Sequence, residues 1–111
     1  MSQKSGLSWL IHDHPIPEIG DQDVLVRLHA ASLNYRDILI AKSTVPLPFF
    51  RPGVIPASDG AGVVEKVGIK VQEFRPGDRV CTYIIPHMPE SKQLCLIDTC
   101  HGLGQAVDGT L

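Results

Sequence analysis

Apolar and polar residues alternate over residues 23–33, and this is the clearest pattern in the chain. If the segment is extended, one of its faces carries four apolar residues: Val24, Val26, Leu28 and Ala30. Arg27 and His29 fall on the opposite face, which indicates that this second face meets solvent. The alternation therefore predicts a β-strand with one buried face.

Two further strands are predicted over residues 59–67 and 79–85. The first of them contains three β-branched residues that suit a pleated surface: Val63, Val64 and Val67. The turn Pro76-Gly77-Asp78 separates the two strands, because proline presets φ and glycine permits a positive φ. Together with the strand over 23–33, these elements predict a mainly β chain.

The segment that follows the first strand, residues 34–42, is predicted to form a short helix with Asn34 as its N-cap. Four prolines then make residues 43–56 a loop. The last four residues, 108–111, are typical of a turn that enters a strand, so we expect the chain to be truncated at its C-terminus. Residues 7–12 could form a further strand. A short apolar run at residues 94–97 could be either strand or helix.

Composition and charge are those of one folded domain that does not bind nucleic acid. Hydrophobic residues make up 43% of the 111 residues and charged residues 20%, a balance that allows a core to form. The net charge is −2 and no basic block is present, which argues against a nucleic-acid partner.

The chain is also predicted to be cytoplasmic and to make no membrane contact. No apolar run reaches the roughly 18 residues of a membrane span, and the first six residues lack the apolar stretch of a secretion signal. The three cysteines, Cys81, Cys95 and Cys100, are then expected to be reduced thiols.

Four motifs follow one another in a fixed order: Asp23–Arg27 with Ala30–Asp37, Pro52–Pro56, Ser58–Val64 and Gly77–Val80. Together they resemble the N-terminal GroES-like domain of the medium-chain dehydrogenase/reductase superfamily, in its zinc-independent alcohol dehydrogenase-like and quinone oxidoreductase-like branch. This resemblance implies a partly open β-barrel, here incomplete, with a short helix after the first long strand. In the family a Rossmann domain that binds NAD(P)H follows, and residues 1–111 contain none, so the resemblance implies half of an enzyme.

The resemblance also implies that the catalytic zinc is missing. Zinc-dependent relatives place a cysteine and a histidine where this chain has Asn34 and Ser58, and a glutamate where it has Asp59. A carboxamide and a hydroxyl are poor zinc ligands, because zinc prefers thiolate, imidazole or carboxylate. A second cluster, Cys95, Cys100 and His101, lacks a fourth ligand at a suitable spacing.

Hydrogen-bond donors would then polarise a substrate carbonyl. By resemblance, Asn34, Tyr35 and Ser58 are the candidate catalytic residues that face the cleft, and Asn34, Tyr35 and Arg36 are the candidate contacts to the cofactor. Asp37 and Asp59 are expected to hold the turns together.

Simpler readings of these residues stay open. Asn34 could act only as a helix cap, and Tyr35 could be a packing residue. Ser58 and Asp59 could serve turn chemistry alone.

The sequence thus predicts the substrate-side domain of a zinc-independent, NAD(P)H-dependent oxidoreductase acting on small alcohol, quinone or carbonyl substrates. The isolated chain is expected to be inactive because it cannot bind the dinucleotide by itself. Alternatives are a truncated gene product and a non-enzymatic GroES-like interaction module, which binds a partner or associates with full-length homologues. A homo-oligomer is also possible.

Overall fold

The computed structural model describes residues 13–42, 53–85 and 102–111. Three features of the sequence lie outside these residues: the run at 7–12, the run at 94–97 and the cluster of Cys95, Cys100 and His101. No helix in the described ranges is long and apolar enough to cross a membrane.

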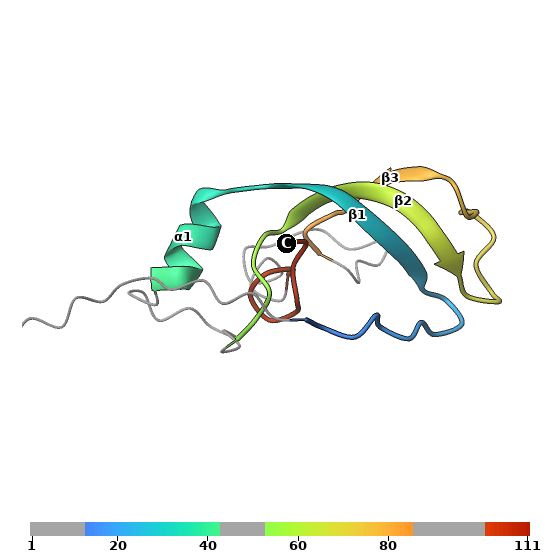
Figure 1. The fold of residues 1–111 in the computed structure, drawn as a ribbon, viewed down its shortest axis with the longest axis horizontal. Coiled ribbons are helices and arrows are strands. Elements are labelled where there is room, and N and C mark those ends of the chain that lie inside the picture. The colour runs from blue at the N-terminus through green and yellow to red at the C-terminus, as the bar shows by residue number, and fades with distance from the viewer. Residues whose placement is uncertain (1–12, 43–52, 86–101) are drawn as a thin grey trace, which may run out of the picture.

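Three antiparallel strands and one helix form the described part of the fold (Figure 1). The strands are β1 (Val24–Ser32), β2 (Asp59–Val67) and β3 (Arg79–Cys81), hydrogen-bonded in the order β1-β2-β3. The helix α1 (Tyr35–Lys42) stands at the end of the sheet where β1 ends and β2 begins. The mainly β fold class, the strand over 59–67 and the short helix are therefore confirmed.

The third predicted strand is shorter than the sequence indicates, because β3 ends at Cys81 and not at residue 85. The backbone N–H of Thr82 still donates to the carbonyl of Gly60 at 2.8 Å. The N–H of Gly60, however, donates to the Thr82 hydroxyl at 2.9 Å instead of to a backbone carbonyl. A side chain thus takes the place of the next ladder bond, and the regular pairing stops there.

The predicted buried face of β1 is wrong beyond its first three residues. Val24 to Val26 are half-buried, but every residue from Arg27 to Ser32 is exposed, and Leu28 keeps 39% of its surface accessible. The pairing with β2 also shifts register twice, between Leu25 and Val26 and between Leu28 and Ala30. Six consecutive exposed residues include both faces of a strand, so neither face of this half of β1 is covered and the alternation does not mark a buried side there.

The buried apolar side chains of the described part come from three different segments. They are Ile40 of α1 (5% exposed), Ala57 before β2 (0%) and Val64 within β2 (1%). Residues 108–111 close over the segment before β2: Gly109 N donates to Ile55 O at 2.7 Å, and Thr110 N donates to Pro56 O at 3.1 Å. The chain end, typical in sequence of a turn that enters a strand, therefore lies along residues 55–57 outside the named strands.

Close backbone contact makes Gly109 sensitive to any side chain. A Cβ at this position would lie 2.0 Å from the carbonyl oxygen of Ala57 and 2.2 Å from that of Pro56. We expect Gly109→Ala to lower the free energy of unfolding by about 3 kcal/mol, because two backbone segments must move apart. Chemical denaturation of the purified chain measures this loss.

Gly53→Ala provides the matched control. Gly53 has a φ of 74° but nothing within 4 Å of an added Cβ, so only left-handed strain of about 1 kcal/mol is expected. Equal losses in the two variants would show that the contact between the C-terminal segment and residues 56–57 does not exist in solution.

Candidate functional site

The first turn of α1 begins directly after β1, and Asn34 occupies its N-cap position. The backbone N–H of Asp37 donates to the carbonyl of Asn34 at 3.0 Å. In return, the Asp37 carboxylate accepts the backbone N–H of Asn34 at 2.8 Å. This return bond is the half of a capping box in which the third helical residue satisfies the N-cap donor. The predicted N-cap position of Asn34 is thus confirmed, although the cap bond comes from the side chain of Asp37.

Asp37 also connects the helix to the segment before β2. Its second carboxylate oxygen, Oδ1, accepts the backbone N–H of Ala57 at 3.0 Å. The residue is only 3% exposed, so the two backbone donors replace the water that an exposed carboxylate would bind. The expectation that Asp37 holds a turn is confirmed, and the turn that it holds lies 20 residues away along the chain.

Ala57 adopts a backbone conformation that is unusual for a residue with a side chain. Its φ is 70°, in the left-handed region, and it is completely buried. The surrounding contacts hold it there, because Asp37 accepts its N–H and the N–H of Thr110 lies 3.2 Å from its carbonyl oxygen. This bend directs the chain into Ser58 and Asp59 at the start of β2.

The side chains of Asn34 and Asp59 meet at the point where β1 ends and β2 begins. Ser32, the last residue of β1, pairs with Asp59, the first residue of β2. Asn34 follows two residues later, and its Nδ2 donates to Asp59 Oδ2 at 2.8 Å. This hydrogen bond is exposed, with Asp59 exposed and Asn34 half-buried.

Tyr35 and Ser58, the other two predicted catalytic residues, differ in exposure. Tyr35 is 73% exposed on the first helical position, next to Leu33 at 75%. Ser58 is only 3% exposed. The structure therefore brings Asn34 together with Asp59, places Tyr35 at the surface near them and sets Ser58 behind the surface.

Arg36 is engaged with the C-terminal segment. Its guanidinium donates to the carbonyl of Leu103 at 2.6 Å and to Oε1 of Gln105 at 3.0 Å. Gln105 is itself 3% exposed. Arg36 was predicted to contact the cofactor. Its contact with the C-terminal segment was missed because the two partners lie 67 and 69 residues further along the chain.

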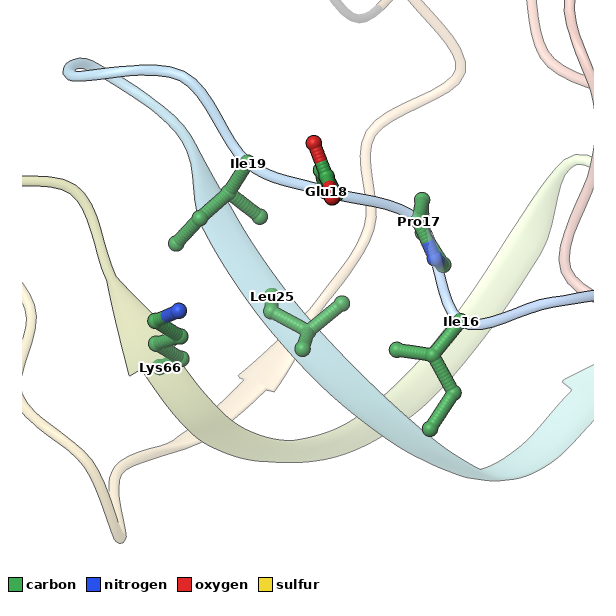
Figure 2. Close-up of a pocket in the computed structure, with 6 residues that line it drawn as sticks. All are labelled: Ile16, Pro17, Glu18, Ile19, Leu25 and Lys66. Carbon is green, nitrogen blue, oxygen red and sulfur yellow. The ribbon is translucent and has the colours of Figure 1, made fainter.

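A hollow of about 330 Å³ lies elsewhere, at the N-terminal end of β1 (Figure 2). It is lined by residues that precede β1 and by one residue each from β1 and β2: Ile16, Pro17, Glu18, Ile19, Leu25 and Lys66. None of the predicted site residues contributes to it. The candidate site is therefore an exposed polar pair at the opposite end of β1.

The family follows from the comparison of this chain with known proteins. Residues 20–111 match the family described as the alcohol dehydrogenase GroES-like domain. The chain belongs to this family. It is thereby a member of the medium-chain dehydrogenase/reductase superfamily, as the motifs indicated.

Individual relatives agree with this assignment. A zinc-type alcohol dehydrogenase-like protein of Schizosaccharomyces pombe is 46% identical over 78 residues, which cover 68% of this chain and 22% of the relative. A chloroplastic quinone-oxidoreductase of Triphysaria versicolor is 44% identical over 68 residues, 60% of this chain and 20% of the relative. The crystal structure of an NAD-dependent alcohol dehydrogenase superposes with a TM-score of 0.67 at 33% identity, over 89% of this chain and 30% of the other. The chain thus spans between 20 and 30% of the length of these proteins.

Among the described residues, the candidate site does not present the thiolate and imidazole donors that zinc prefers. At the candidate site Asn34 turns its NH₂ group, which cannot ligate a metal, toward Asp59. Ser58, which could add a hydroxyl, is buried. In the described residues no three His, Cys, Asp or Glu side chains gather where they could hold a metal ion. The zinc-free state of the domain stays a prediction.

The described residues do not form a dinucleotide-binding fold. The described residues form an antiparallel sheet, whereas dinucleotide-binding domains hold the pyrophosphate at a glycine-rich turn between a parallel strand and a helix. Contacts from Asn34 and Tyr35 to a cofactor on a neighbouring domain stay predictions.

The buried carboxylate of Asp37 gives a direct test of this architecture. Asp37→Asn keeps the shape of the side chain but turns an N–H donor toward one of the two backbone N–H groups that the carboxylate binds, at Asn34 and at Ala57. We expect a loss of about 3 kcal/mol in the free energy of unfolding, since a buried donor loses its partner and a charge-assisted bond is lost. Urea denaturation measures the change.

Asp78→Asn is the matched control. Asp78 accepts the backbone N–H of Arg75 at 2.9 Å in an exposed turn, so water can replace the lost bond. A loss below about 1 kcal/mol is expected there. If Asp37→Asn costs no more than Asp78→Asn, Asp37 does not connect α1 to Ala57 as described.

Proposed function

We propose that this chain is the substrate-side domain of an NAD(P)H-dependent oxidoreductase that works without zinc. The observation that carries the proposal is the 2.8 Å hydrogen bond between Asn34 Nδ2 and Asp59 Oδ2. It lies at the positions where zinc-dependent relatives carry a cysteine and a glutamate, and it offers a hydrogen-bond donor in place of a metal. Some relatives are named as alcohol dehydrogenases and one as a quinone-oxidoreductase. These names support the proposal that the substrate is an alcohol, a carbonyl compound or a quinone.

In the proposed reaction the chain binds and polarises the substrate, while the cofactor carries the hydride. Asn34 has a second amide N–H that can donate to a carbonyl oxygen as negative charge develops on it. The exposed phenol of Tyr35 stands one residue further along and can donate to the same oxygen or to the nicotinamide amide. Ser58 is proposed as the third catalytic residue, although only 3% of its surface is exposed in this structure.

The nicotinamide cofactor is proposed to lie against Asn34 and Tyr35 and to be held by a separate domain. Arg36 was also expected at the cofactor. Because its guanidinium donates to Leu103 and Gln105, we propose that it supports the site by fixing the C-terminal segment. The assembled enzyme is proposed to act in the cytoplasm.

A polypeptide of these 111 residues alone is expected to show no dehydrogenase activity. Without a domain that binds the dinucleotide, hydride and substrate are not brought together, and proximity is a large part of such catalysis. NADPH absorbance, followed with quinone and aldehyde acceptors, should fall no faster than with an Asn34→Ala/Tyr35→Phe control. Faster oxidation by the unaltered chain would contradict the proposal that a separate domain must hold the cofactor.

The purified chain is also expected to carry far less than one zinc ion per molecule. An amide and a hydroxyl bind zinc weakly in comparison with thiolate and imidazole. Elemental mass spectrometry after dialysis measures the content, with an Asn34→Cys/Ser58→His variant as the control that restores both ligand types. Zinc held in a one-to-one ratio by the unaltered chain would refute the zinc-free mechanism.

A further inference from the structure

The hydrogen bond between Asn34 and Asp59 also indicates a role for Asp59. We infer that Asp59 is a positioning residue, which fixes the orientation of the Asn34 amide and gives the site a negative charge that selects neutral carbonyl ligands over anionic ones. The ligand class rests on the proposed function. The orientation of the amide can be measured without any ligand.

The orientation follows from which groups can donate. The amide of Asn34 has two ends of similar shape, an NH₂ group with two donors and an oxygen that only accepts. A carboxylate only accepts, so only the NH₂ end of Asn34 can face Asp59 at 2.8 Å. The bond is charge-assisted and therefore stronger than a bond between neutral groups. It uses one N–H and leaves the other free to donate to a ligand oxygen.

The backbone on both sides of the pair is held by other contacts. The N–H of Asn34 donates to Asp37 at 2.8 Å, and Ser32 pairs with Asp59 across the two strands. The carbonyl of Asp59 accepts the Thr110 hydroxyl at 2.9 Å. A change in the Asp59 side chain should thus alter the orientation of the amide while leaving the positions of both residues unchanged.

The charge of Asp59 is not neutralised by its described neighbours. Ion pairs in the described part of the chain include those of Arg27 with Glu65 and of Lys70 with Asp21, and Asp59 is in no ion pair with another described residue. A ligand carboxylate brought to Asn34 would therefore meet a like charge close by, which disfavours binding. A neutral ketone, aldehyde or quinone meets no such penalty.

Nuclear magnetic resonance of the isotope-labelled 111-residue chain tests the orientation. We expect one of the two Asn34 side-chain amide protons to lie downfield and to exchange with water about tenfold more slowly than in Asp59→Ala, as a bond to a charged group requires. Glu65→Gln, which alters an exposed carboxylate on the same strand, should leave the Asn34 signals unchanged. Asn34 signals that do not differ between the unaltered chain and Asp59→Ala would overturn the positioning role.

A matched pair of ligands tests the charge selection. Methyl levulinate and levulinate share a ketone and differ in charge. Titration followed by the Asn34 side-chain signals should show the ester binding about fivefold more tightly, the effect of one like charge near a solvated site. In Asp59→Asn this ratio should fall to about one.

The two measurements separate the possible failures. Equal binding of ester and acid to the unaltered chain would overturn the charge selection. If neither compound binds although the amide signal behaves as expected, the proposed carbonyl site is refuted and the positioning of Asn34 by Asp59 stands. A preference for the ester that persists in Asp59→Asn would show that another group sets the selectivity.

Discussion

The buried carboxylate of Asp37 is the constraint on which the rest of the site depends. It is 3% exposed and accepts one backbone N–H from each of two segments, at Asn34 and at Ala57. A buried carboxylate is stable only when such donors replace water. Because both donors belong to the backbone, Asp37 fixes the path of the chain at the start of α1 and before β2. These are the two places from which Asn34 and Asp59 project.

The first turn of α1 thereby gathers segments that are far apart in the sequence. Asn34 contacts Asp59, Asp37 contacts Ala57 and Arg36 contacts residues 103–105. Residues 108–111 complete the arrangement by bonding to the backbone of 55–57, where Gly109 leaves room for close approach. The left-handed conformation of Ala57 is held by these surrounding contacts, which is how local strain is usually kept in proteins. We therefore expect the site and the C-terminal segment to form or unfold together.

The proposed chemistry follows from what occupies the metal-ligand positions of zinc-dependent relatives. An amide bonded to a carboxylate cannot act as a Lewis acid, but it presents an oriented donor at the surface. Oriented donors stabilise developing negative charge effectively when their direction is fixed before the reaction. In this proposal, Asp59 replaces part of what a metal would do by holding Asn34 in one orientation. Its charge also restricts which ligands can approach.

Local pattern in the sequence determined the family, the helix after β1 and the bounds of β2, because valines, glycines and a capping residue act over a few neighbouring positions. Tertiary structure alone decided which partners the polar side chains found. The identity of Arg36 does not indicate that its guanidinium binds a carbonyl 67 residues away, nor that Leu28 on an apolar stripe stays 39% exposed. Such contacts depend on where the backbone brings distant segments together. A residue type limits the partners that a side chain can take, and the three-dimensional path of the chain selects among them.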